Sequence, residues 1–138
     1  MYGLMVPQVY EYETLIHKSQ NLPVCVFYLN ASRPILNNDL PLLHAHEVNG
    51  FNGTIVATSL DTHFYLNRAT RKGKNIFYVR TLEWLEKEDY YENQVDNYTN
   101  PNTIYVASSD YIARELDICW GTQAQVIREI EFEKIYDV

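Results

Sequence analysis

The stretch Gly53–Glu83, GTIVATSLDTHFYLNRATRKGKNIFYVRTLE, predicts a strand, a helix and a second strand in succession. Thr54–Thr58 is β-branched and apolar but too short for a helix, as in a strand that is buried on both faces. Ser59 offers a hydroxyl where a helix N-cap needs one, and Asp61 places a negative charge in the first turn. Ile76–Val79 forms a second buried run. The stretch therefore predicts a βαβ unit with parallel strands and a right-handed crossover.

The helix of this unit is expected to have an apolar stripe, made of Leu60, Phe64 and Ala69 with Tyr65 beside them. Arg71 and Lys72 are expected in its last turn, and Gly73 in a left-handed conformation that closes it. With Arg68 and Lys74 these cations form a basic group. Such a group either complements the helix C-terminus or contacts a small phosphate or sugar phosphate.

Further strands are predicted at Val24–Leu29, Thr103–Ala107 and Gln125–Arg128. A helix carrying Tyr91, Val95 and Tyr98 on one face is expected to end at Asn100-Pro101. Another helix, capped by Ser108 or Ser109 and closed by Gly121, is expected to be lined by Ile112, Leu116 and Cys119. Five strands with intervening helices predict a single Rossmann-like, three-layer α/β domain over residues 1–138, with a mostly parallel sheet.

The two ends of the chain are less clearly patterned. Near the N-terminus, Val9, Tyr10 and Tyr12 favour a strand, while Glu11–Gln20 equally favours a helix. The segment Glu129–Val138 resembles an edge or exit strand because charges alternate with Ile130, Phe132 and Ile135. Asn30–Pro41 is expected to be a polar loop.

The composition excludes several classes of function. A net charge of −7 argues against a general nucleic-acid or anionic-membrane binder, since phosphate neutralisation needs clustered cations. Met1 does not open a signal peptide, and no apolar run is long enough to span a bilayer, so we expect a cytoplasmic protein without a membrane partner. Cys25 and Cys119 lie in apolar segments and predict two buried free thiols.

Polar residues follow the predicted parallel strands, where ligands bind in open α/β sheets. These candidate binding residues are Asn30 and Ser32, then Ser59, Asp61 and Thr62, then Arg80 and Glu83, and finally Ser108 and Ser109. The helix N-termini at Ser59 and Ser108 present N–H groups to an anion or a sugar hydroxyl. The same serines equally fit ordinary helix caps.

Three ionisable residues are candidates for proton transfer. Glu83 directly follows a buried strand beside Trp84, where burial would raise its pKa and make it a proton acceptor or a hydroxyl anchor. Alternatively, Glu83 pins its loop by accepting backbone N–H bonds. Asp61 is followed closely by His63, and either could act as a base in a cleft.

Metal and nucleotide motifs are missing from the sequence. His44 and His46 would share one face of a strand, next to Glu47, but no third ligand follows at a recognised spacing and HEXXH is absent. We therefore expect no metal site. No P-loop or GxGxxG occurs either, so we expect neither a bound cofactor nor a self-sufficient nucleotide site.

Residues Gly53 to Gly121 resemble the N-terminal domain of GT-B type glycosyltransferases. The resemblance is carried by a strand ending in "ATS" and a lysine-led strand, matched by Ala57, Thr58, Ser59, Thr62, Lys74, Phe77, Tyr78, Val79, Leu82 and Glu83. Ile104–Ser109 followed by Asp110–Gly121 continues it. The stretch also resembles short glycosyltransferase-like proteins of tailed bacteriophages. Arg80 and Thr81 depart from the family pattern, which usually has Gln or Trp followed by Asp.

The resemblance implies the acceptor-side half of a transferase that uses a nucleotide sugar. In that family the donor is held mostly by a second domain, so activity would require a partner chain or a homodimer. Asp61, His63 or Glu83 would be the base, and the substrate would contact Ser59, Thr62, Arg80, Ser108 and Ser109. The alternative is a non-catalytic protein-interaction module, such as a phage accessory protein, favoured by the aromatic and acidic segment Trp84–Tyr98.

Overall fold

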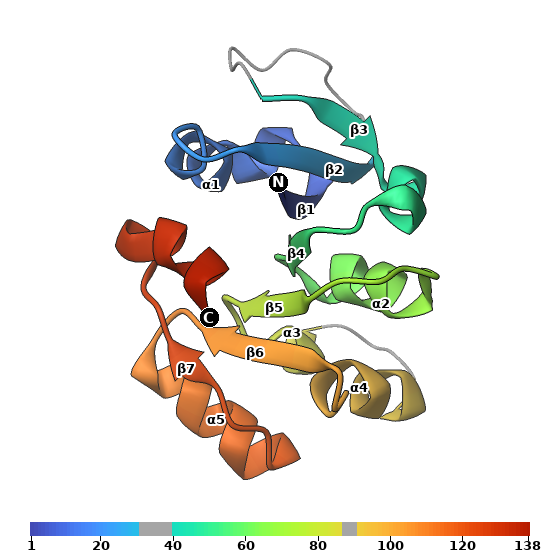
Figure 1. Cartoon of the computed structure of the whole chain (residues 1–138). Coiled ribbons are helices and arrows are strands. Elements are labelled where there is room, and N and C mark those ends of the chain that lie inside the picture. Colours follow the sequence, from blue (N-terminus) through green and yellow to red (C-terminus); the bar gives the residue numbers. More distant parts are fainter. Residues whose placement is uncertain (31–39, 87–90) are drawn as a thin grey trace.

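The computed structural model describes residues 1–30, 40–86 and 91–138, and within these ranges the chain forms one seven-stranded sheet (Figure 1). The strand order is β3-β2-β1-β4-β5-β6-β7, and every neighbouring pair is parallel. The strands are β1 Tyr2–Gln8, β2 Val24–Asn30, β3 Leu42–His44, β4 Thr54–Ala57, β5 Asn75–Val79, β6 Thr103–Ala107 and β7 Gln125–Val126. The predicted α/β class and parallel sheet are confirmed, with seven strands rather than about five.

Helical segments cover both faces of this sheet (Figure 1). They are η1 Tyr10–Tyr12, α1 Glu13–Lys18, η2 Ala45–Gly50, α2 Leu60–Arg68, α3 Glu83–Glu86, α4 Tyr91–Tyr98, α5 Asp110–Trp120 and η3 Glu129–Asp137. Side chains of α1 and η3 pack in the core cluster on one face. Side chains of η2, α2, α3, α4 and α5 pack in the cluster on the other.

Side chains alternate between the two faces along the central strands and so contribute to both clusters. In β5, Ile76 and Tyr78 face α1 and η3, while Phe77 and Val79 face the α2 side. All four side chains are buried, which explains why the strand appears in the sequence as a continuous apolar run.

The strand β1 was not predicted from the sequence, which instead favoured a strand a few residues later. Its apolar run is interrupted by Gly3, Pro7 and Gln8, which weakens the strand pattern. Yet β1 lies at the centre of the sheet, between β2 and β4. A Cβ at Gly3 would lie 2.8 Å from Ile55 Cγ1 and 3.0 Å from Phe27 Cε2, so glycine allows the close approach of the neighbouring strands' side chains.

Helix α2 begins as predicted and ends earlier than predicted. Ser59 Oγ accepts a hydrogen bond from the Thr62 N–H, and Thr62 Oγ1 accepts one from the Ser59 N–H, forming a reciprocal capping box. The helix ends at Arg68, where Ala69 becomes extended. Arg71 and Lys72 therefore lie beyond the last turn that we expected them to occupy.

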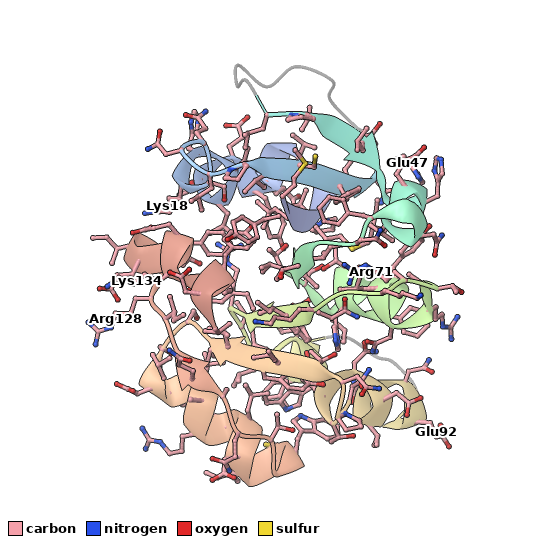
Figure 2. The ribbon with its side chains drawn as sticks, viewed as in Figure 1. Lys18, Glu47, Arg71, Glu92, Arg128 and Lys134 are labelled. Atoms are coloured by element: carbon pink, nitrogen blue, oxygen red, sulfur yellow. The ribbon has the colours of Figure 1, made fainter. Side chains whose placement is uncertain are left out.

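Arg71 instead ties the following turn together. Its guanidinium donates to the carbonyl oxygens of Phe51 and Gly53 and to the side chain of Asn75. Figure 2 shows this side chain within the outline of the molecule, whereas the charged residues Lys18, Glu47, Glu92, Arg128 and Lys134 lie around its edge. Gly73, with a φ of 123°, closes the turn before β5 rather than the helix.

The C-terminal segment is a 3₁₀ helix, so the predicted edge strand is wrong. Phe132, Ile135 and Tyr136 are buried at a helical spacing, while Ile130 is exposed. The preceding helix α5 follows the prediction: Ser109 caps it, and Gly121 closes it with a φ of 67°.

Some predicted environments also need correction. Cys25 is buried and Cys119 is exposed, so only the first fits the expectation of two buried thiols. Trp84 and Tyr98 are buried in the core and pack ring against ring, with centroids 4.9 Å apart. Ser32 and Tyr90, together with most of the predicted 30–41 loop, lie outside the described residues.

Candidate functional site

A pocket of about 310 Å³ opens at the point where the strand order reverses. From β1 the chain proceeds outward to β2 and β3, whereas β4 begins the series that runs to β7 in the other direction. Residues after β1, β4 and β5 line the pocket, at the carboxyl ends of these strands. This is the crevice in which open α/β sheets bind their ligands.

Four of the residues singled out from the sequence meet in this pocket: Ser59, Asp61, Arg80 and Glu83. Thr62 is fully buried beneath it, with its hydroxyl engaged in the capping box. Ser109 caps α5, and the hydroxyl of Ser108 donates to the backbone oxygen of Arg80 at 3.3 Å. These last three residues therefore support the local backbone rather than line the pocket.

Glu83 closes the N-terminus of α2. Both of its carboxylate oxygens accept from the Leu60 N–H, at 3.0 and 3.1 Å. The first N–H groups of a helix have no partner within the helix, and its dipole favours negative charge at this end. The pinning role considered from the sequence is therefore present. It also means that the carboxylate of Glu83 occupies the place where a phosphate would otherwise bind.

Arg80 contacts residues of two neighbouring elements, η1 and η3. Its Nε lies 2.6 Å from Glu129 Oε1 on η3, and its guanidinium carbon lies 5.1 Å from the centre of the Tyr12 ring. Burial, and then the charge of Glu83, raise the pKa of the Tyr12 phenol, so Tyr12 is a neutral hydrogen-bonding group at physiological pH.

The pocket is strongly acidic. Among the described residues that line it, the carboxylates of Glu11, Asp61, Glu83 and Glu86 face a single guanidinium, that of Arg80. Part of that positive charge is already paired with Glu129 outside the lining. A ligand phosphate would be repelled here, whereas ligand hydroxyls would find several hydrogen-bond acceptors.

His63 lies elsewhere, in the core beneath α2. Its ring is fully buried and stacks on Phe77 with centroids 4.4 Å apart, and Nε2 lies 3.0 Å from the hydroxyl of Thr103. Burial lowers the pKa of the imidazole to about 3, with the neighbouring Asn97 only partly opposing this effect. The ring is therefore neutral and is not placed to be the base that its spacing from Asp61 indicated.

The histidines after β3 form a surface pair. His44 ends β3 and His46 lies in η2, with their Nδ1 atoms 2.6 Å apart, while His46 Nε2 lies 3.2 Å from Glu47. Within the described ranges, no group of three or more His, Cys, Asp or Glu side chains is arranged to hold a metal ion.

One wall of the pocket was not predicted from the sequence. Gln8 ends β1, Glu11 and Tyr12 follow it, and Thr58 and Glu86 also line the pocket near α2 and α3. The signal for the first three residues depends on recognising β1 as a strand, because only then does the same carboxyl-end rule select them.

Compared with known protein families, curated proteins and solved structures, the chain shows no match. In the part of the chain that the structure describes, no helix has the length and apolar character needed to cross a bilayer. Function is therefore inferred from the shape and charge of the pocket.

Proposed function

We propose that this chain is the acceptor-binding half of a GT-B-like glycosyltransferase, and that the acceptor enters the switch-point pocket. The observation that carries the proposal is the excess of carboxylates around the pocket, combined with a helix N-terminus that Glu83 already fills. Carboxylate oxygens accept hydrogen bonds from hydroxyl groups. The pocket thus suits the sugar or other polyol that receives a glycosyl group better than the diphosphate of a donor.

Asp61 is the residue proposed to take the proton. It is exposed in the first turn of α2 and lines the pocket. In the transfer step, the acceptor oxygen bonds to the anomeric carbon of the donor, whose bond to the diphosphate oxygen breaks. The nucleoside diphosphate leaves with the bonding electrons, and the hydroxyl proton passes to the Asp61 carboxylate.

The remaining pocket residues would position the acceptor. Glu83 is fixed by the Leu60 N–H and would accept a hydrogen bond from a ligand hydroxyl. Arg80 is held between Glu129 and Tyr12, which orients its other N–H groups. Ser59 acts indirectly, because its hydroxyl caps α2 and sets the direction of Asp61.

A second polypeptide would supply the donor. The acidic pocket repels a diphosphate, and the sequence holds no phosphate-binding loop. The donor site would then belong to a partner chain or to a second copy of this chain. The alternative, a protein-interaction module, drew on exposed aromatic residues, but Trp84 and Tyr98 are buried and do not support it.

Ligand binding monitored by protein NMR tests the proposal. We expect neutral mono- and disaccharides to shift the backbone amide signals of Ser59, Asp61 and Arg80, and UDP, GDP, ADP and TDP alone to leave them in place. Asp61→Asn should weaken saccharide binding. Asp110→Asn is the matched control, because Asp110 is also exposed in the first turn of a helix capped by serine, away from the pocket.

Two results would overturn the proposal. One is the binding of a nucleoside diphosphate in this pocket while every saccharide fails to bind. The other is equal saccharide affinity of the Asp61→Asn and Asp110→Asn proteins. Solution mass measured on the same samples shows whether a homodimer is available to supply the donor site.

A further inference from the structure

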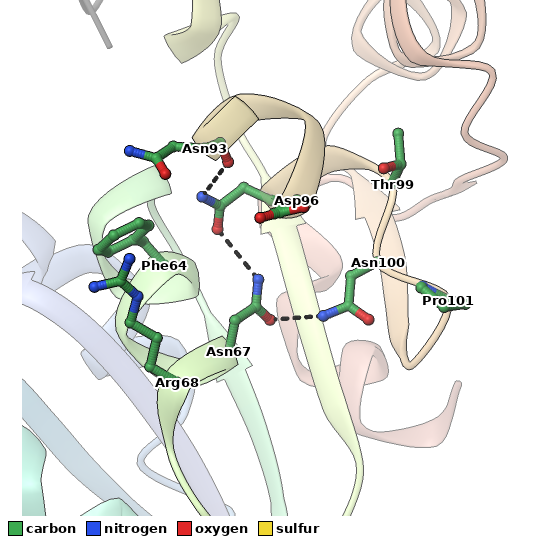
Figure 3. Close-up of a pocket in the computed structure, with 9 residues that line it drawn as sticks. Phe64, Asn67, Arg68, Asn93, Asp96, Thr99, Asn100 and Pro101 are labelled. Atoms are coloured by element: carbon green, nitrogen blue, oxygen red, sulfur yellow. Dashed lines mark hydrogen bonds between the residues drawn. The ribbon is translucent and has the colours of Figure 1, made fainter. Parts of the chain in front are cut away.

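A larger cavity, of about 370 Å³, lies between α2 and α4 (Figure 3). It is formed where both helices end and where the chain turns through Asn100 and Pro101 into β6. Helix α2 therefore begins at the switch-point pocket with Asp61 and ends at this cavity with Asn67 and Arg68. The cavity is at the opposite, amino-terminal edge of the sheet.

Asparagine side chains dominate its wall and hold one another in place. The amide nitrogen of Asn100 donates to Asn67 Oδ1 at 3.0 Å, and the amide nitrogen of Asn67 donates to Asn97 Oδ1 at 3.3 Å. Asn97 in turn donates to the backbone oxygen of Asn93 at 2.8 Å. Figure 3 shows the Asn67 amide at the middle of this chain of hydrogen bonds.

The network is anchored to the core on its inner side. The Tyr105 hydroxyl donates to the Asn97 carbonyl at 2.7 Å and accepts from the Asn100 N–H at 2.9 Å. Asn97 is almost completely buried. These contacts fix the orientation of the amides before any ligand arrives, which lowers the entropic cost of binding.

The amides keep hydrogen-bonding capacity toward the cavity. A carboxamide offers two N–H donors and two acceptor lone pairs. Among the described residues, Asn67 uses one N–H and one lone pair, and Asn100 does the same, its oxygen accepting from the Asn102 N–H at 2.9 Å. Each side chain thus retains a donor and an acceptor, the pair that a ligand hydroxyl needs.

The charge of the cavity is balanced. Among the described lining residues, Arg68 is the one cation and Asp96 the one anion. The Arg68 guanidinium lies 3.9 Å from the centre of the Phe64 ring, so it covers a face of that ring on which an aromatic ligand would otherwise stack. These features disfavour a charged ligand and a nucleobase.

We propose that this cavity is a second binding site, for a neutral polyhydroxylated molecule of the size of one sugar ring. At ~30 Å³ per water molecule, its volume corresponds to roughly a dozen waters, which is enough space for one sugar ring. The proposal does not depend on the acceptor role of the switch-point pocket. It is based on the amide network together with the size and the balanced charge of the cavity.

The asparagine side-chain NH₂ signals, observed by NMR, provide the test. The probes are glucose, galactose, mannose and N-acetylglucosamine, with glucuronate and glucosamine as charged comparisons. We expect at least one neutral sugar to shift the NH₂ signals of Asn67, Asn97 and Asn100 with a Kd of about 1 mM. Charged analogues should bind no more tightly.

Variants separate the amide chemistry from the fold. Asn67→Leu should reduce affinity at least tenfold, and Arg68→Ala, a milder surface change, should reduce it about threefold. Asn102→Ala is the matched control, because this exposed residue lies in the same turn and contributes only its backbone N–H. Asp61→Asn, in the switch-point pocket, should leave the sugar affinity of this cavity unchanged.

Three outcomes would overturn the proposal: NH₂ signals that no neutral sugar moves, a charged analogue that binds more than tenfold tighter than every neutral sugar, or unchanged affinity in folded Asn67→Leu protein. If Asn67→Leu does not fold, the proposal is tested by the NH₂ shifts of the wild type and by the sugar affinity of Arg68→Ala. In that case, retention of full affinity by Arg68→Ala counts against the proposal.

Discussion

Replacing Glu83 by alanine should destabilise the protein, because its carboxylate caps the N-terminus of α2. The carboxylate accepts from the Leu60 N–H with both oxygens, at 3.0 and 3.1 Å, and it neutralises the N-terminus of α2. Removing it leaves that N–H without its partner in a partly buried position. The negative charge at the positive end of the helix dipole is lost as well.

The size of the effect follows from these two losses. A hydrogen bond to a charged group contributes about 1.5–3 kcal/mol, and a charge at a helix terminus about 0.3–1 kcal/mol. Because Glu83 is partly exposed and water can replace part of both terms, we expect a net loss of about 2 kcal/mol for Glu83→Ala. Glu83→Gln keeps one acceptor oxygen and should lose about 1 kcal/mol.

Urea denaturation followed by circular dichroism measures this difference directly. For 138 residues the entropy of unfolding is about 0.3 kcal/mol/K, so a loss of 2 kcal/mol lowers the Tm by about 7 °C. Glu86→Ala is the control, because Glu86 is exposed on the same helix and lines the same pocket; it should change stability by less than about 0.5 kcal/mol. Equal losses in the Ala variants of Glu83 and Glu86, or no loss in either, would refute the capping role.

Three further predictions concern His63, Arg71 and two core tyrosines. The buried His63 has a pKa of about 3 in the folded protein and ~6.5 in the unfolded chain, so its contribution to stability is present above pH 6.5 and is lost as the pH falls toward 3. Denaturation across this pH range should show a steeper loss of stability in the wild type than in His63→Leu. Parallel plots of stability against pH for the two proteins would contradict this prediction. Arg71→Lys should cost about 2 kcal/mol in denaturant unfolding, because an ammonium cannot reproduce the three contacts of the guanidinium, while exposed Lys72→Ala changes little. Tyr98→Phe should leave stability unchanged or raise it, because the buried Tyr98 hydroxyl has no hydrogen-bond partner among the residues that the structure describes. Tyr78→Phe should lower stability by about 1 kcal/mol, because it removes a 2.6 Å hydrogen bond to the backbone carbonyl of Ile127. Calorimetric Tm values in the reverse order would contradict both hydrogen-bonding states.

The central βαβ unit was predictable because its local signals agree with its packing. Ser59 caps α2, and the apolar runs on either side form β4 and β5, each buried on both faces. The carboxyl-end rule then selected Asp61, Arg80 and Glu83, which do meet in one pocket. Local propensity and global fold point the same way in this part of the chain.

Other features could not be predicted from the sequence because tertiary contacts decide them. The spacing from Asp61 to His63 does not show that the ring turns inward onto Phe77. Arg71 looks like a helix-terminal cation, yet it binds carbonyl groups that are distant in sequence. Trp84 lies in an acidic segment but is buried against Tyr98.

The pocket is assembled from two parts of the chain that are separate in sequence. The stretch that resembles glycosyltransferases contributes Asp61, the proposed proton acceptor, and Glu83, the anchored carboxylate. Glu11 and Tyr12 come from the region after β1, which lies outside that resemblance, and they form the facing wall. The groups proposed for the chemistry and for the choice of acceptor are therefore separate in sequence. Substitutions at Glu11 or Tyr12 should change which acceptor binds, whereas substitution of Asp61 should also slow transfer of the sugar.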